Sequence, residues 1–165
     1  MYADARRHDL KRKHARFLTV AIVLLALAGL FAVNSRAAAP VGRYTISADT
    51  VADLKTGLLW QRQAAATSSG YSLATSACGT LSLGGSPAGT WRVPTLKELQ
   101  TLVDWRATGT AIDATAFPGP YGAADNFWSA TANVSSLGLY WVVSFERGNN
   151  GYLPQGTAAR VRCVH

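Results

Sequence analysis

The chain has 165 residues, with 16 Lys and Arg against nine Asp and Glu, and a formal net charge of +7. Six of the basic residues fall within residues 1–16, while residues 34–165 carry ten basic and seven acidic side chains. The excess positive charge therefore belongs mainly to the N-terminal tail, which argues against a nucleic-acid-binding surface on the rest of the chain. The length fits one domain with additional segments.

An uncharged apolar run, residues 17–33, follows the basic segment 1–16. This order predicts a membrane-targeting sequence, with its basic end in the cytoplasm and the remaining chain outside it. The length of this run is at the short limit of a membrane-spanning helix, roughly 17–25 residues. It is slightly greater than that of the apolar region of a cleavable signal peptide, roughly 7–15 residues. Ala37 and Ala39 offer a cleavage motif, but Pro40 would hinder the peptidase. Two outcomes stay open: a signal anchor that holds a periplasmic or extracellular domain at the membrane, and a cleaved signal peptide with a secreted domain.

Residues 34–42 are predicted to be a linker, and residues 43–165 have the size of a single domain. The first element expected in this domain is a β-hairpin over residues 49–63. Gly57 lies between its two apolar arms and permits the tight turn that a hairpin needs.

Residues 72–85 predict a first helix. Leu73, Ala77 and Leu81 recur every four residues and would form its apolar stripe. Gly84 and Gly85 follow this stripe and would end the helix.

Residues 95–104 predict a second helix. Thr95 and Glu98 have the spacing of a capping box, in which each side chain accepts from the other residue's amide. The apolar positions have helical spacing and predict a face packed on a core; they are Leu96, Leu99, Leu102 and Val103. With Trp91 just before the helix, this stretch is interpreted mainly as scaffold, since buried aromatics dominate core energetics.

The remaining elements are short strands and loops. Residues 106–126 predict a long loop, while residues 127–131 and 138–146 have the composition of β-strands. A turn is expected at 147–151, and the alternation in 159–165 predicts a final strand. Two helices followed by antiparallel strands predict an α+β fold.

Cys78 and Cys163 are the two cysteines of the chain. Export would place them in an oxidising compartment, where a disulfide persists. Such a long loop closure is worth about 4–5 kcal/mol in the chain-entropy model. The alternative is two free thiols, one of them catalytic, for which the sequence offers only His165, the last residue, as a nearby base.

Several motifs follow one another in a characteristic order: TGLLWQ, WRVPTLKELQTLVD, FWSAT, YWVVSFERG and VRCV. Together they resemble the Lcl C-terminal domain family over residues 45–165. The resemblance implies a C-type-lectin-like fold, akin to domains of the formylglycine-generating-enzyme type. The known member of the family is the tip of a bacterial collagen-like adhesin that recognises sulfated glycosaminoglycans. The sequence departs from this pattern in lacking a collagen-like stretch and the calcium motifs of sugar-binding lectins.

The sequence gives little support to catalysis. His8, His14 and His165 lie in the tail or at the last position, so they predict neither a nucleophile–histidine pair nor a metal site. The acidic residues of the domain show no pairing signal, and no phosphate-binding or dinucleotide fingerprint is present. We therefore expect a non-enzymatic binding module in the bacterial envelope, without cofactor or metal. The alternatives are a formylglycine-generating-type enzyme and a structural envelope domain that binds protein partners.

Function concentrates on loops, and the resemblance to lectin-like folds places a ligand on residues 105–126 and on the turn 147–152. The candidate ligand-binding residues are Trp105, Arg106, Asp125, Asn126, Arg147, Asn149, Asn150 and Tyr152. The aromatic rings offer flat apolar faces, and the arginines could pair with sulfate or carboxylate. The asparagines could instead be turn residues, and Trp105 could belong to a satellite core cluster. Trp60, Trp128 and Trp141 lie inside the family motifs and are expected to be scaffold. The predicted ligand is an acidic glycan or surface polymer, with a protein as the alternative and without nucleic acid.

Overall fold

The computed structural model describes residues 39–65, 70–106 and 109–165, which all belong to one compact unit, Ser35–His165. The basic segment 1–16 and the apolar run 17–33 lie outside these described residues. Within the described ranges, no helix combines the length and the apolar character needed to span a bilayer.

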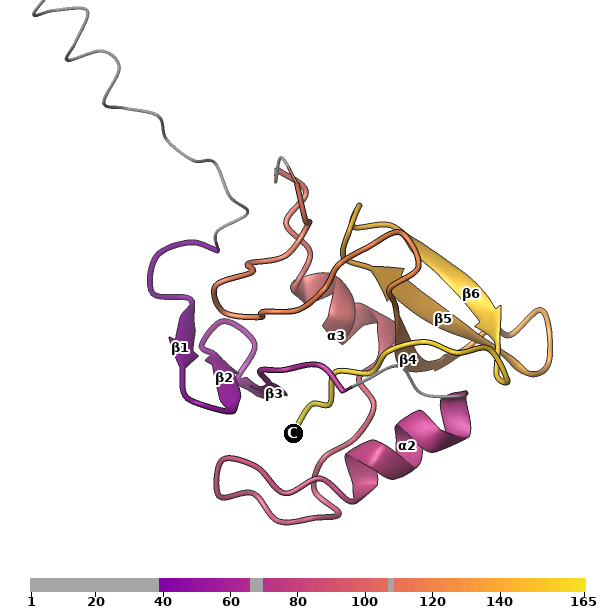
Figure 1. Ribbon diagram of the computed structural model, residues 1–165, viewed down its shortest axis with the longest axis horizontal. Helices are drawn as coiled ribbons and strands as arrows, with labels where there is room; N and C mark the ends of the chain where they lie inside the picture. Colours follow the sequence, from indigo (N-terminus) through magenta and orange to yellow (C-terminus); the bar gives the residue numbers. More distant parts are fainter. Residues whose placement is uncertain (1–38, 66–69, 107–108) are drawn as a thin grey trace, which may run out of the picture. The chain divides into compact units, whose positions relative to one another are not determined.

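The described residues form two antiparallel three-stranded sheets and two helices (Figure 1). The first sheet contains β1 (Tyr44–Ile46), β2 (Thr50–Asp53) and β3 (Leu58–Gln61), in that order. The helices are α2 (Tyr71–Gly79) and α3 (Leu96–Thr101). The second sheet contains β4 (Asn126–Ala132), β5 (Leu139–Ser144) and β6 (Asn150–Pro154), again in chain order. The predicted α+β class is therefore confirmed.

The hairpin expected over residues 49–63 is present as β2 and β3. Val51 pairs with Trp60 across the two strands, and both side chains are fully buried. Gly57 supplies the turn with a φ of 75°. Strand β1 was not predicted from the sequence, because its three residues are mostly exposed and it owes its strand conformation to pairing with β2.

The first helix is present, but its predicted extent and buried face were wrong. Helix α2 ends at Gly79, and its buried residues are Ala74 and Cys78. Leu73 and Ala77, which the predicted stripe placed in the core, are exposed. Both faces have residues spaced by four, so spacing alone did not distinguish them.

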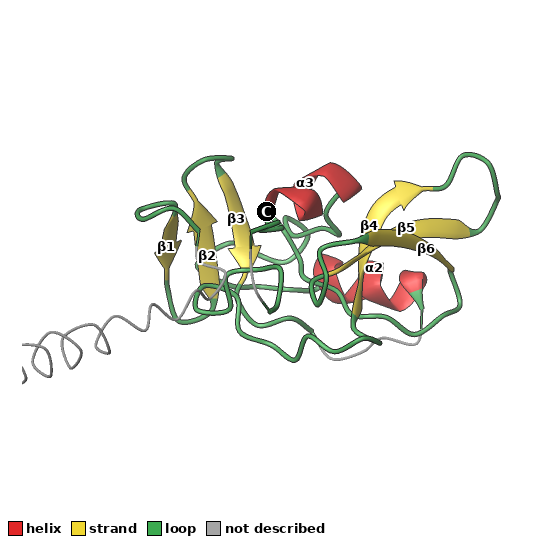
Figure 2. Cartoon of the chain, turned by 90° about the horizontal axis from the view of Figure 1, so that it is seen from above, coloured by secondary structure: helices red, strands yellow, loops and turns green. Residues whose placement is uncertain are grey.

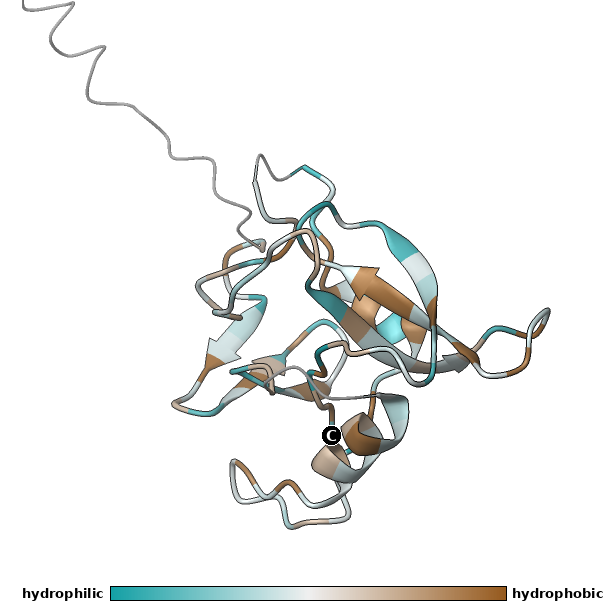
Figure 3. Ribbon diagram, turned by 45° about the vertical axis from the view of Figure 1, so that its right-hand side comes forward, coloured by the Kyte–Doolittle hydropathy of each residue, from teal (hydrophilic) through white to brown (hydrophobic). Residues whose placement is uncertain are grey.

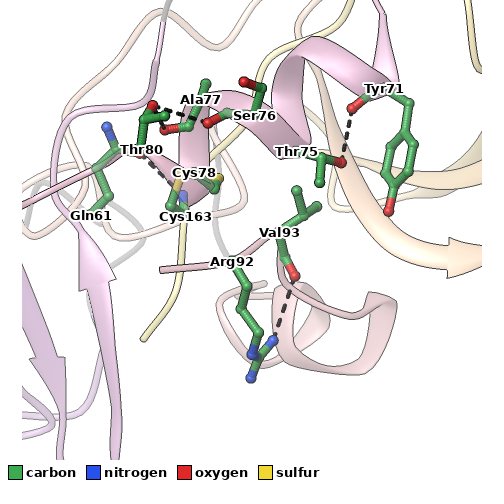
Figure 4. The surroundings of a disulfide bond; sticks show 10 residues. All are labelled: Gln61, Tyr71, Thr75, Ser76, Ala77, Cys78, Thr80, Arg92, Val93 and Cys163. Carbon is green, nitrogen blue, oxygen red and sulfur yellow. Dashed lines mark hydrogen bonds between the residues drawn. A yellow bond between two sulfur atoms is a disulfide. The ribbon is translucent and has the colours of Figure 1, made fainter. Parts of the chain in front are cut away.

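The disulfide decides which face of α2 is buried. Cys78 is bonded to Cys163, as the sequence predicted (Figure 4). Their Cα atoms are 5.5 Å apart. The backbone of Cys163 is itself fixed to β3, because its amide donates to Gln61 Oε1 at 3.1 Å and its carbonyl accepts from the Gln61 amide at 2.9 Å. Helix α2 is thereby held against the C-terminal segment.

Helix α3 begins with the capping box that the sequence predicted. Thr95 Oγ1 accepts from the Glu98 amide at 3.2 Å, and Glu98 Oε2 accepts from the Thr95 amide at 2.7 Å. Arg92 adds two hydrogen bonds to the same carboxylate, 2.8 and 2.6 Å long. This guanidinium lowers the pKa of Glu98 to about 2. The helix is shorter than the predicted 95–104, but Leu99 and Leu102 are buried as expected.

The second sheet confirms the two predicted strands and corrects the third. Strand β4 covers the predicted segment 127–131, and β5 lies within the predicted segment 138–146 but ends earlier, at Ser144. The third strand is β6, which begins at Asn150 within the predicted turn 147–151, and not residues 159–165. That C-terminal segment forms only isolated bridges, because it changes partner from residue to residue.

Residues 159–165 run between the two sheets and contact both. Phe127 pairs with Arg160 on one side, and Trp60 and Arg92 both pair with Val164 on the other. Figure 2 shows this segment and α3 between the two sheets. A segment that changes partner in this way alternates like a strand in sequence without joining either sheet.

The core consists of two clusters, one on each face of the second sheet (Figure 3). Val143 belongs to the cluster that includes α3 and the hairpin, and Val142 belongs to the cluster that includes α2 and the disulfide. Arg162 is fully buried at the first cluster, with its guanidinium 5.0 Å from the ring centroid of Phe117. It donates to the carbonyls of Gln61 and Arg62 and to the Tyr121 hydroxyl. Arg162 therefore joins β3 to the loop that precedes β4.

Candidate functional site

The two segments predicted to form the site meet at Gly148. A β-carbon built at Gly148 would lie 2.8 Å from Val103 Cγ1, 3.1 Å from Ala111 Cβ and 3.5 Å from Trp105 Cζ3. The amide of Ala111 also donates to the carbonyl of Phe145 at 2.7 Å. The loop after α3 therefore packs directly against the turn between β5 and β6, and this close approach requires glycine at position 148.

Trp105 lies at this contact with most of its surface in solvent. Its side chain is 71% exposed, while one ring edge faces Gly148. The ring therefore touches the turn at one atom, Cζ3, while most of the residue is open to solvent. Of the two alternatives for this residue, the structure favours an exposed ring over a satellite core cluster.

Arg106 and Arg147 flank this contact in sequence, and both guanidinium groups are open. Their side chains are 85% and 75% exposed, respectively. Within the described residues, each has only a long ion pair with a neighbour, 3.9 Å from Arg106 Nε to Asp104 Oδ1 and 3.6 Å from Arg147 Nε to Glu146 Oε2. Since close charge-assisted hydrogen bonds are about 2.7–2.9 Å long, both arginines keep donors free for an external anion.

Asp125 has a structural role in the fold. Its carboxylate accepts hydrogen bonds from Arg160 Nε and from the Gly122 amide, the latter at 2.8 Å. The bond from Arg160 is the main reason that the pKa of Asp125 is lowered. The carboxylate thus ties the loop before β4 to the C-terminal segment.

The three candidate asparagines lie at one end of the second sheet. Asn126 pairs with Ser144 across β4 and β5, and the carbonyl of Asn149 accepts from the Ser144 amide at 2.9 Å. Asn150 begins β6 opposite Val143. Asn149 serves the turn through its backbone, while its side chain and that of Asn150 are exposed.

Tyr152 lies farther along β6, away from the arginines. Its side chain is 55% exposed and meets the ring of Trp141 edge to face, with centroids 5.9 Å apart. Trp141 was expected to be scaffold, but it is only half-buried. Its position could have been found from the alternation of side chains along β5, which places Trp141 on the same face of the sheet as Val143. Tyr152 is its paired residue on the neighbouring strand β6.

A hollow of 190 Å³ lies beside Arg106, and no motif in the sequence predicts it. Its lining includes Arg106, Lys55, Arg43, Asp104 and Asp113. Arg43 already donates to Asp53 at 2.7 Å and to the Thr101 carbonyl at 2.7 Å, and Asp113 Oδ2 accepts from the Ala39 amide at 3.1 Å. The mixed charge favours no single class of ligand. Among the side chains of residues 39–65, 70–106 and 109–165, no group of His, Cys, Asp and Glu could hold a metal ion.

Fold and site together define a disulfide-linked α+β domain whose open aromatic and basic groups gather where a loop meets a turn. The sequence model of the Lcl C-terminal domain matches residues 49–165. The chain therefore belongs to the Lcl C-terminal domain family, which confirms the resemblance drawn from its motifs. Among proteins with curated descriptions, none matches this sequence.

Proposed function

We propose that this protein is a non-enzymatic binding module of the bacterial envelope, and that its ligand is an acidic glycan or surface polymer. The proposal includes a C-type-lectin-like fold for the domain. It also includes a signal anchor or signal peptide at residues 17–33, which carries the domain to the outside of the cytoplasmic membrane. A reporter fused to the C-terminus and active only in the cytoplasm should then be silent.

One observation carries the proposal. Trp105 presents an open ring at the Gly148 contact, and the two arginines next to this contact lack close carboxylate partners. A planar guanidinium matches the two oxygens of a sulfate or carboxylate, and an aromatic ring packs on the apolar face of a sugar. These three side chains supply what an acidic sugar needs.

The disulfide weighs against the enzymatic alternative. A reaction of the formylglycine-generating type needs reactive thiols, and the two cysteines of the chain are bonded to each other. A thiol titration of the denatured protein without reductant tests this point. Zero free thiols are expected, and two would revive the alternative.

The binding test uses the full chain with two acidic polymers, dextran sulfate, which carries sulfate groups, and polygalacturonate, which carries carboxylates. Because the basic segment 1–16 attracts polyanions by itself, binding is counted only beyond that of a peptide of residues 1–16. We expect this additional binding to be weak and to decline between ~0.01 M and ~0.15 M salt, as the screening length shortens from about 30 Å to about 8 Å. Arg106→Ala combined with Arg147→Ala should abolish it, and Lys97→Ala, which removes an exposed cation on α3, should not.

The paired replacement by lysine sharpens this test. Arg106→Lys with Arg147→Lys keeps both charges but removes the planar forks, so binding should weaken without disappearing. Binding that survives the double alanine change would exclude this site.

A further inference from the structure

One face of β5 and β6 combines aromatic rings with uncharged hydrogen-bonding groups. The register pairs Leu139 with Pro154, Trp141 with Tyr152, and Val143 with Asn150. Because side chains alternate along a strand, these paired residues share one face of the sheet. Val143 is buried, whereas Asn150, Tyr152 and Pro154 are exposed. This face therefore extends from the core into solvent.

The aromatic pair on this face forms an open corner. The rings of Trp141 and Tyr152 are inclined at 88°, so each leaves part of its surface uncovered by the other. Trp60, Trp91 and Trp128 are buried with their indole N–H groups inside the core, whereas Trp141 is only half-buried. In the described part of the chain, neither the Trp141 indole N–H nor the Tyr152 hydroxyl has a hydrogen-bonding partner.

The second sheet carries no charged side chain. Residues 126–145 and 148–159 contain no Asp, Glu, Lys, Arg or His. The charged residues that border these ranges are Asp125 before β4, Glu146 and Arg147 in the turn, and Arg160 after residue 159. A charged group brought to the aromatic corner would lose water without gaining a partner, so this surface favours an uncharged ligand.

We propose that Trp141 and Tyr152 form a second subsite, which takes an uncharged sugar ring. The apolar C–H face of such a ring packs on an aromatic side chain. Its hydroxyls can accept from the Trp141 indole and exchange hydrogen bonds with the Tyr152 hydroxyl and the Asn150 amide. The sugar thereby meets both the apolar and the polar groups that this face leaves open.

This second subsite rests on the proposed function, and it specifies the ligand further. Tyr152 lies four positions after Gly148, a span of at most ~13 Å of extended chain. One glycan chain can therefore contact the arginines at its acidic groups and the aromatic corner with an uncharged ring. The substrate class is a glycan that contains both uncharged and acidic sugars.

The test uses three uncharged probes, chitotetraose, maltotetraose and galactotetraose, beside dextran sulfate. The full chain is kept in a detergent without a sugar head group, and binding is measured by calorimetry. We expect at least one uncharged probe to bind weakly and without dependence on salt. Tyr152→Ala should weaken this binding about tenfold, as expected for loss of an aromatic contact, and Tyr152→Phe should keep most of it.

Matched variants separate the two subsites. Leu73→Ala removes another exposed side chain, on α2, and should leave all binding unchanged. Arg106→Ala with Arg147→Ala should abolish the dextran sulfate binding that exceeds that of residues 1–16, and leave the uncharged probe bound. If the arginine changes do not affect dextran sulfate, the proposed acidic site fails while a Tyr152-dependent result for the uncharged probe stands.

Two results would overturn the second subsite. One is that no uncharged probe shows binding that depends on Tyr152. This result includes the case in which the surface at Tyr152 binds only a polypeptide. The other is that Tyr152→Ala weakens dextran sulfate as much as the double arginine change does. Melting temperatures of all variants, measured alongside, identify any loss that comes from unfolding.

Discussion

Arg92 and Arg106 lie on either side of helix α3 and differ in what surrounds their guanidinium groups. Arg92 reaches both oxygens of Glu98 at 2.8 and 2.6 Å, whereas Arg106 lies 3.9 Å from its nearest carboxylate oxygen. At the start of the helix, charge is used to hold the fold together. After its end, beside the turn that contains Arg147, the guanidinium group of Arg106 is exposed to solvent. The difference separates a scaffold end of the domain from the end at which we propose that the ligand binds, called the binding end below.

The largest expected effect is at the disulfide, which holds the scaffold end. The bond joins residues 85 positions apart, and loss of a native disulfide from a small domain typically costs about 2–5 kcal/mol. Cys78→Ser and Cys163→Ser should lower the free energy of unfolding by similar amounts, and the double variant should be no worse than either. Urea denaturation without reductant measures this. Additive losses would contradict direct coupling of the two residues.

Gly148 tests how closely the binding end is packed. Gly148→Ala would place a methyl group 2.8 Å from Val103 Cγ1 at a φ of 76°, so we expect a loss of about 2–3 kcal/mol from strain and overpacking. Gly57→Ala is the matched control, because Gly57 has a φ of 75° but no atom within 4 Å of its built β-carbon. It should lose only about 1 kcal/mol. Equal losses in thermal or urea unfolding would mean that the contact with Val103 is unimportant.

Glu98 tests the charge pairing of the scaffold end. Arg92 lowers the pKa of Glu98 to about 2. The stability from this carboxylate is therefore present above its unfolded pKa, about 4.3, and is lost as the pH falls toward about 2. Glu98→Gln should cost about 1 kcal/mol at pH 7, since the ion pair is partly exposed.

The same variant should also lose less stability than the parent between pH 5 and pH 2 (about the window set by the two pKa values). Urea midpoints across this range measure the difference. If the urea midpoints of the two proteins changed in parallel with pH, ionisation of Glu98 would not stabilise the fold.

The smallest expected effect on stability is at the open arginines. Arg106→Ala and Arg147→Ala should each change the free energy of unfolding by less than about 0.5 kcal/mol, because neither side chain has a close partner. Arg92→Ala, by comparison, should cost about 1 kcal/mol. Thermal unfolding of the three variants under one condition is sufficient. If Arg106→Ala proved as costly as Arg92→Ala, the separation of scaffold and binding ends would be lost.

The sequence by itself determined the parts of this protein that depend on local chemistry. The capping box of Thr95 and Glu98, the turn at Gly57 and the strands around Trp128 follow from residue types at short spacing. The family also follows from sequence, because its motifs keep a fixed order along the chain. The site predictions rest on the same kind of local signal, since exposed turn and loop residues are recognisable in the sequence, and their role in binding stays a prediction.

Tertiary structure decided what local pattern left ambiguous. Leu73 and Ala74 have equivalent helical spacing, and the bond between Cys78 and Cys163 selected Ala74 for the core. Residues 159–165 alternate like a strand, yet their partners change between the two sheets, so they form only bridges. The approach of Trp105 to Gly148 likewise depends on how a loop and a turn pack after folding. Such choices arise from contacts between distant segments, and no short window of the sequence contains both partners of those contacts.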